Sequence, residues 1–199
     1  MEIHYAGRMP DMRRLTSTVV VVAGDGAGDV VAGLDGLHNV RAIPRGERRP
    51  AEVMELAARS AATYVVHDAD PLADVAAAWT GYFDGTGVVG GLEVAIEAAL
   101  GELRGDRLVL PDYYLVLDPD GMTETWRHWW LGVLAGAAPV RVVPVHASAA
   151  AVGEELGRLS AGRWWPADLE TWLRGLPRVV PDRAGLPSGG RMTPVTSVA

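Results

Sequence analysis

Residues 17–24 read STVVVVAG, a continuous run of apolar, mostly β-branched side chains that ends at a glycine. Such a run is typical of a strand with both faces buried, which occurs where helices cover both sides of a parallel sheet. Further strands are predicted at 39–45, 64–67, 113–117 and 140–148. We expect the first of these at a sheet edge because it is short, and the last near an edge because Pro144 cannot donate a backbone hydrogen bond.

Helical segments alternate with these strands. Apolar spacing of three and four residues, with proline or acidic residues in several first turns, predicts helices at 29–37, 49–62, 71–83, 92–103, 123–138, 149–162 and 166–176. This alternation predicts a three-layer, Rossmann-like α/β domain with a mostly parallel sheet of about five strands. We expect a single domain over residues 1–180 and a flexible C-terminal tail at 181–199, which is rich in Pro, Gly, Ser and Thr.

The composition excludes several kinds of chemistry. The chain has 199 residues, no cysteine, and 18 basic residues that are all arginine. Disulfides, cysteine-ligated zinc, a P-loop lysine and Schiff-base catalysis are therefore ruled out. The abundance of Ala, Gly, Val and Arg indicates a GC-rich, and we infer bacterial, genome. The net charge of −7 argues against nucleic-acid binding, and no apolar run approaches the ~20 residues of a membrane span, so we expect a cytoplasmic protein.

Polar side chains follow the predicted strands at the point where each strand ends. In chain order they are Asp25, then His67, Asp68 and Asp70, then Asp118 and Asp120, then His146 and Ser148. Because the carboxyl ends of parallel strands meet at one edge of a sheet, and ligands bind there, we expect these groups to share an edge. Whether they converge on one pocket depends on the strand order, which the sequence does not reveal.

Two interpretations of these residues stay open. As a functional site, the catalytic candidates are His67, Asp68 and Asp118, while Asp70, Asp120 and His146 are candidates for ligand binding. Carboxylates with imidazole could hold a divalent metal such as Mg²⁺, grip a ribose, or supply an acid and a base. As turn and N-cap residues, the aspartates would serve the backbone alone.

Two glycine-rich segments add weaker indications. Residues 24–29 read GDGAGD, which lacks the spacing of the dinucleotide-binding fingerprint, and its aspartates would repel a phosphate. Residues 84–91 read DGTGVVGG, where amides near Gly85 and Thr86 could bind an anion and Glu93 could serve as a further catalytic residue. The alternative for the second segment is a turn between two helices.

Seven tryptophans stand beside a single phenylalanine. Trp126, Trp129 and Trp130 share one face of the predicted helix 123–138, while Trp164 and Trp165 precede the last helix. Packing between these helices is one interpretation. A surface for a homo-oligomer or a protein partner is the other, because tryptophan and arginine are common interface anchors.

The sequence therefore supports two functional hypotheses. The first is a small-molecule-binding α/β domain, with or without enzymatic activity, for a nucleotide-like or sugar-like ligand at the carboxyl edge of the sheet. The second is a non-catalytic interaction or assembly module that uses the tryptophan-rich helices. The substrate, the reaction type and any cofactor stay open at this stage.

Overall fold

Five strands form one sheet in the order β2-β3-β1-β4-β5, and every neighbouring pair is parallel. Their bounds are β1 (Thr18–Ala23), β2 (Val40–Ile43), β3 (Tyr64–His67), β4 (Tyr113–Leu117) and β5 (Val142–Val145). The computed structural model describes residues 17–160 and 165–180, so the tail expected at 181–199 lies outside the described residues. The predicted three-layer fold, the parallel sheet and the edge positions of β2 and β5 are confirmed.

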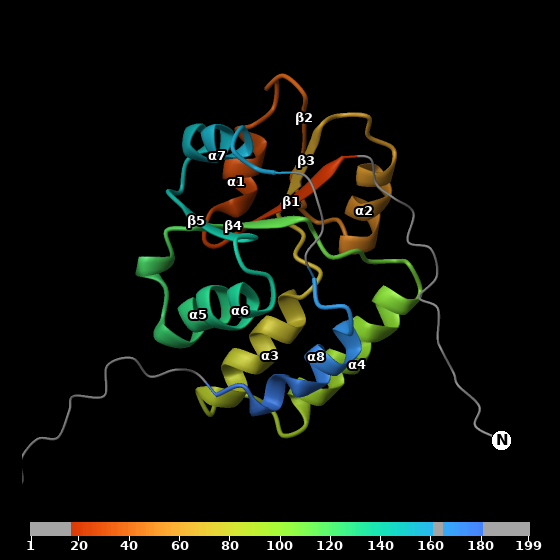
Figure 1. The fold of residues 1–199 in the computed structure, drawn as a ribbon, viewed down its shortest axis with the longest axis vertical. Helices are drawn as coiled ribbons and strands as arrows, with labels where there is room; N and C mark the ends of the chain where they lie inside the picture. Colours follow the sequence, from red (N-terminus) through yellow and green to blue (C-terminus); the bar gives the residue numbers. More distant parts are fainter. Residues whose placement is uncertain (1–16, 161–164, 181–199) are drawn as a thin grey trace, which may run out of the picture.

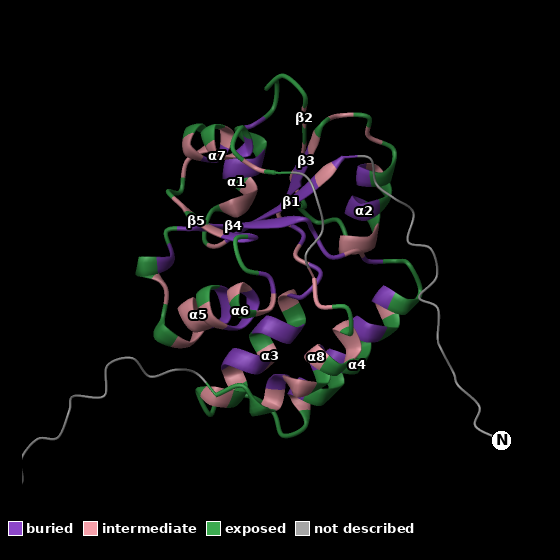
Figure 2. Ribbon diagram, in the orientation of Figure 1, coloured by how far each residue is buried: buried purple, intermediate pink, exposed green. Residues whose placement is uncertain are grey.

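Helices cover both faces of the sheet (Figure 1). On one face lie α1 (Ala27–Ala32) and α7 (Ala149–Leu156). On the other face lie α2 (Pro50–Ala58), α3 (Ala73–Phe83), α4 (Gly91–Arg104), α5 (Glu124–His128) and α8 (Leu169–Gly175). The alternation of side chains along β1 divides the core accordingly: Val20 and Val22 pack toward α1, and Val21 and Ala23 pack toward the larger layer. The neighbouring central strands are buried in Figure 2, β4 along its whole length and β1 everywhere except at its first residue, Thr18.

The path of the chain explains this division of the helices. From β1 the chain passes through α1 to the edge strand β2, and α2 then returns it to β3, which pairs with β1. The next connection, through α3 and α4, crosses to β4 on the other side of β1. Because parallel crossovers are right-handed, connections that run in opposite directions along the sheet place their helices on opposite faces.

The predicted helix 123–138 contains a π-helical segment. It consists of α5, the π-helix η2 (Trp129–Leu134) and α6 (Ala135–Ala137). Trp129 and Trp130 lie in this segment and are 0% and 5% exposed. The ring centroids of Trp129 and Trp79 are 5.7 Å apart, so these rings belong to the core.

The remaining tryptophans named in the sequence differ in exposure. Trp126 and Trp165 are half-buried and pack against the larger core. The indole N–H of Trp165 donates to the carbonyl oxygen of Pro111 at 2.7 Å. Trp164 lies outside the described residues. In the ranges 17–160 and 165–180, no helix combines the length and apolarity that a membrane crossing requires.

Candidate ligand-binding site

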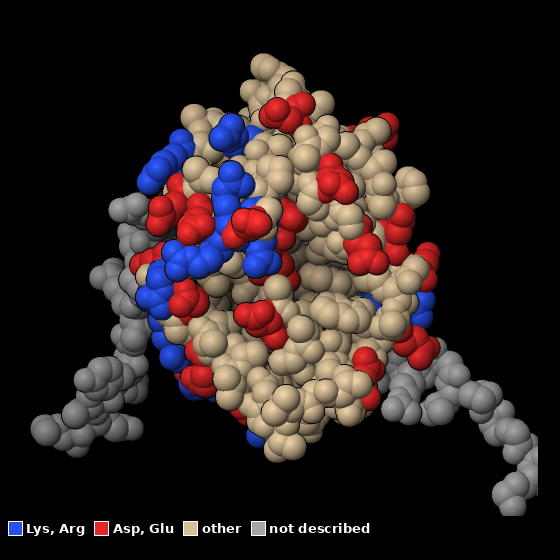
Figure 3. All heavy atoms as spheres, turned by 180° about the vertical axis from the view of Figure 1, so that it is seen from behind, with Lys and Arg blue, Asp and Glu red and all other residues tan. Residues whose placement is uncertain are grey.

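A cavity of about 740 Å³ opens where β1, β3 and β4 end. The turn after β1 contributes Asp25, the first turn of α1 contributes Asp29, and the turn after β3 contributes Asp68 and Asp70. Figure 3 views the molecule from behind, where its surface is hollowed and acidic side chains, together with basic ones on one side, lie around the hollow. The cavity therefore has an acidic part built by two of the turns singled out from the sequence.

An apolar wall faces this acidic part. It is formed by Ala73 and Ala76 of α3, Met122 of the turn after β4, and Trp126 and Trp130 from α5 and η2. Trp130 is nearly fully buried, and its ring centroid lies 5.5 Å from that of Tyr114. The π-helical segment thus brings one of the two indoles, that of Trp130, to the cavity.

The cavity coincides with the point where the direction of the connections reverses. β1 and β4 are neighbours, but the chain leaves β1 toward β2 and leaves β4 toward β5. Loops that diverge in this way leave a crevice at the carboxyl ends of the two strands, which is the usual ligand site in open parallel sheets. The strand order therefore supplies the information on convergence that the sequence lacked.

Glycine residues allow the turn after β1 to approach its neighbours closely. Gly24 has φ of 120°, and a Cβ atom there would lie 3.1 Å from both the Cβ and the carbonyl oxygen of Leu117. Gly28, in the first turn of α1, would place a Cβ atom 3.2 Å from Oδ2 of Asp68. The GDGAGD segment is therefore a tight turn that makes room for the carboxylate of Asp68.

Asp68 is half-buried, and its orientation is fixed by the loop after β2. Its Oδ1 atom accepts a hydrogen bond of 2.6 Å from the backbone N–H of Arg45. The Arg45 guanidinium is directed elsewhere, since its Nε donates to the carbonyl oxygen of Arg48 at 3.1 Å. The Asp68 carboxylate is therefore oriented by the backbone of Arg45 and not by an ion pair with its guanidinium.

Asp70 is the carboxyl group with the most unusual environment in the cavity. Its Oδ1 accepts 2.9 Å and 2.7 Å hydrogen bonds from the Leu72 N–H and the Tyr114 hydroxyl. Burial raises the pKa of Asp70 from 3.8 to about 6, although these two hydrogen bonds oppose the rise, and the negative charge of Asp74 adds to it. At neutral pH, Asp70 is therefore the wall residue best suited to exchange a proton.

The backbone hydrogen bond to Asp70 also changes where the next helix begins. Helix α3 starts at Ala73, two residues after the predicted start at Pro71. Asp70 caps the short turn through Leu72 instead of the helix itself. Tyr114, whose hydroxyl holds the same oxygen, is fully buried, and burial together with the charge of Asp70 raises its pKa well above 10.

His67 is fully buried and does not line the cavity. In the sheet it pairs with Ile43 of β2 and Val21 of β1, so its ring lies among apolar side chains of the larger core. Burial lowers its pKa from 6.5 to about 4. The backbone at Ala69 opposes this shift, but neither ring nitrogen has a partner of full hydrogen-bond geometry among the described residues.

The turns after β4 and β5 form a second, exposed polar group. The Nδ1 atom of His146 lies 2.9 Å from Oδ1 of Asp118, and both side chains are exposed. Asp118 has φ of 40°, a left-handed conformation that aspartate tolerates better than most residues. Asp118, Asp120 and His146 are not among the described residues that line the cavity.

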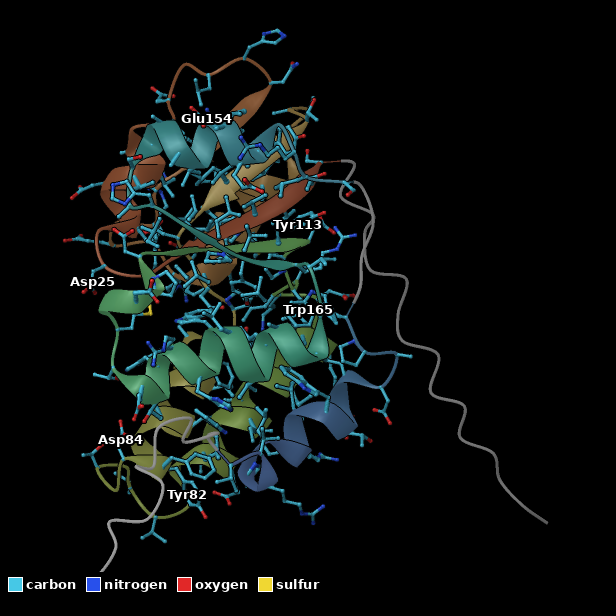
Figure 4. The ribbon with its side chains drawn as sticks, turned by 60° about the vertical axis from the view of Figure 1, so that its left-hand side comes forward. Asp25, Tyr82, Asp84, Tyr113, Glu154 and Trp165 are labelled. Carbon is cyan, nitrogen blue, oxygen red and sulfur yellow. The ribbon has the colours of Figure 1, made fainter. Side chains whose placement is uncertain are left out.

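Gly85, Thr86 and Glu93 are exposed. Gly85 and Thr86 belong to the connection between α3 and α4, and Glu93 lies in the first turn of α4. Figure 4 places Tyr82, near the end of α3, and Asp84, directly after α3, far from the sheet edge marked by Asp25. These three residues are therefore not brought together with Asp68 and Asp70. Their proposed roles stay predictions without support from the cavity.

Several wall residues were not selected as ligand contacts from the sequence. Trp126 and Trp130 had a partial signal, because they stand four residues apart after the predicted strand 113–117. Met122 carried no signal. In the ranges 17–160 and 165–180, no three His, Asp or Glu side chains are grouped closely enough to hold a metal ion, so Mg²⁺ stays a prediction.

Comparisons with models of protein families, with curated proteins and with solved structures find no match to this chain. The fold and the cavity nevertheless define a class of protein. It is an α/β protein whose parallel sheet carries a ligand-sized cavity at its topological switch point. This architecture fits a small-molecule-binding domain.

Proposed function

We propose that the protein binds a nucleoside-like or sugar-like small molecule in the cavity at the carboxyl ends of β1, β3 and β4. The observation that carries this proposal is the pairing of an acidic part with an aromatic wall in a cavity of about 740 Å³. Carboxylates such as Asp68 accept hydrogen bonds from hydroxyl groups, and an indole such as Trp126 packs against a ring. Cavities of ~300–1,000 Å³ are typical of small-molecule sites.

The charge of the cavity narrows the ligand class to molecules without a phosphate. The acidic part contains Asp25, Asp29, Asp68 and Asp70, and no arginine is found among the described residues of the lining. A phosphate group would meet like charges there and would gain no guanidinium partner. Nucleosides and free sugars are therefore favoured over nucleotides and sugar phosphates.

Asp70 is the residue best placed for chemistry if the ligand is turned over. Its Oδ1 is occupied by two hydrogen bonds, which leaves Oδ2 as the atom available to a ligand. A carboxyl group with a pKa of about 6 changes its protonation state near neutral pH, as a general acid or base requires. Tyr114 would act as a positioning residue, because it reaches the ligand only through Asp70.

A thermal-shift screen tests the proposal directly. Adenosine, uridine, ribose and glucose are added at millimolar concentration, and a ligand present at tenfold its Kd is expected to raise Tm by about 3–5 °C. Asp68→Asn should reduce this shift strongly, because the amide replaces a carboxylate oxygen that accepts hydrogen bonds. Asp35→Asn is the matched control, since Asp35 is exposed on the turn after α1 and does not line the cavity.

A substitution at Gly28 tests the same cavity without changing its charge. Gly28→Ala is expected to change the free energy of unfolding by less than about 1 kcal/mol, because alanine favours the helical backbone of α1. The new methyl group must displace the Asp68 carboxylate by a few tenths of an ångström, so ligand affinity should fall. Gly101→Ala in α4 is the matched control, because its Cβ would have no atom within 4 Å. Equal affinities for the two variants and the wild type would count against the assignment of the cavity.

The interaction-module hypothesis has less structural support. Trp129 and Trp130 are buried in the core, and Trp126 and Trp165 are only partly accessible to a partner. A homo-oligomer or protein partner at these residues stays a prediction that light scattering across a concentration series can check.

A further inference from the structure

Among the residues that the structure describes, no arginine pairs with the carboxylates of the cavity. None of Asp25, Asp29, Asp68 and Asp70 has a salt-bridge partner among the residues that the structure describes. The arginines that do form ion pairs are placed elsewhere, for example Arg174 with Glu97 and Arg107 with Glu102. Four like charges around one cavity repel one another, and a bound cation would relieve that repulsion.

The aromatic wall is continuous with the most buried of these carboxylates. Trp130 packs against Tyr114 with ring centroids 5.5 Å apart, and the Tyr114 hydroxyl donates to Asp70 at 2.7 Å. Trp126 lines the same cavity from α5. A cation that approaches Asp70 therefore lies close to indole rings, whose faces attract positive charge.

We infer that the cavity recognises a small organic cation, namely a nucleoside-like or sugar-like molecule that carries a protonated amine. This inference rests on the proposed function, since it specifies the charge of the ligand at the same site. A compact metal ion fits less well than an extended cation, because no three carboxylates of the described chain are grouped closely enough to ligate one. An amine on a ring can instead meet one carboxylate while the ring packs on tryptophan.

The ionisation of Asp70 gives this inference a second observable. Titratable groups around Asp70 come from several elements. They are His67 and Asp68 on the same segment, Asp74 on α3, Tyr114 on β4, Asp25 on the turn after β1 and Asp29 in the first turn of α1. A protonated amine binds the ionised form of Asp70, so binding near pH 6 must release a proton. A neutral ligand that accepts a hydrogen bond from the protonated carboxyl would release none.

Two matched sets of ligands test the inference by isothermal titration calorimetry. The first set is 5′-amino-5′-deoxyadenosine, adenosine and adenosine 5′-monophosphate. The second set is 6-amino-6-deoxyglucose, glucose and glucose 6-phosphate. We expect the cavity to prefer the ring of one of these sets. Within that set, the amine should bind at least about tenfold more tightly than the hydroxyl compound, and the phosphate should bind at least about tenfold more weakly than the hydroxyl compound.

The dependence on pH and on Asp70 provides the second readout. Affinity for the amine should rise about tenfold between pH 5 and pH 7.5, as Asp70 ionises, and repeats in buffers of different ionisation enthalpy should show proton release at pH 6. Asp70→Asn should abolish both effects, whereas the control Asp35→Asn should keep them. This comparison separates the charge of Asp70 from any general effect of pH on the protein.

The outcomes distinguish the inference from the proposed function. If adenosine or glucose binds as tightly as its amine, the inference is overturned and the proposed function stands. If no member of either set binds to the full chain, both are overturned. An amine preference that survives Asp70→Asn would also overturn the inference, since it would assign recognition to other groups.

Discussion

Asp70→Asn is expected to stabilise the protein at pH 8 by about 1–3 kcal/mol while it weakens ligand binding. Burial raises the pKa of Asp70 from 3.8 to about 6. At pH 8 the carboxylate is ionised, and its charge is less favourable in the folded protein than in the unfolded chain. A shift of about two units corresponds to about 3 kcal/mol. Asparagine keeps an oxygen that can accept from the Leu72 N–H and the Tyr114 hydroxyl, but it carries no charge.

The sign of this effect reverses the usual behaviour of carboxylates. A raised pKa means that the folded state binds a proton more tightly than the unfolded state, so Asp70 adds stability as pH falls from about 6 toward 3.8. The advantage of Asp70→Asn over the wild type should therefore be largest above pH 7 and should disappear near pH 4. Urea unfolding at pH 8 and pH 4 measures both values.

Asp35→Asn serves as the control in these unfolding experiments. Asp35 is exposed on the turn after α1, so its substitution should change the free energy of unfolding by no more than about 0.5 kcal/mol at either pH. If the free energies of unfolding of Asp70→Asn and the wild type differed by the same amount from pH 8 to pH 4, the raised pKa of Asp70 would be contradicted. A variant that is more stable but binds less tightly shows that Asp70 is kept for function at a cost in stability.

The fold could be predicted from the sequence because its determinants are local. The run of valines in β1 and the alternation of strands and helices fixed a parallel sheet, and β4 was predicted with its observed bounds, Tyr113–Leu117. The strand order could not be predicted, because β3 pairs with β1 only after the chain has passed to β2 and back. The π-helical geometry of Trp129–Leu134 also left no mark in the apolar spacing.

The candidate site was predicted in part, for a related reason. Asp68 and Asp70 follow β3, which pairs directly with the central strand β1, and they line the cavity. Asp118 follows β4, the other neighbour of β1. Its backbone is left-handed, and its exposed side chain contacts His146 and does not line the cavity. A residue's position after a strand thus predicts the edge of the sheet but not the direction of the side chain.

The second large effect concerns His67, which was selected as catalytic and lies buried beside the cavity segment. Its pKa of about 4 in the folded protein, against 6.5 ordinarily, means that the folded state resists protonation. The free energy of unfolding therefore contains the full contribution of neutral His67 above pH 6.5. It falls by about 3 kcal/mol as the pH drops from 6.5 to 4. His67→Leu removes the titration and fills a similar volume among apolar neighbours.

The expected result for His67→Leu is a stability difference that grows in acid. At pH 7 the variant should be as stable as the wild type or more stable by about 1–3 kcal/mol. The reason is that it removes a buried polar ring whose nitrogens lack a hydrogen bond of full geometry among the described residues. At pH 4 its advantage should exceed the pH 7 value by about 3 kcal/mol. A catalytic role for the ring would instead appear as lost turnover without this acid-dependent gain.

His67 and Asp70 shift the pH dependence of stability in opposite directions and by similar amounts. Protonation of His67 destabilises the folded state between pH 6.5 and 4, whereas protonation of Asp70 stabilises it between about pH 6 and 3.8. In the wild type these two contributions nearly cancel. Relative to the wild type, Asp70→Asn alone should therefore lose about 3 kcal/mol on going from pH 7 to pH 4, and His67→Leu alone should gain about as much. The double variant should follow the wild-type pH profile, and a profile that matches either single variant would show that one of the two shifts is absent.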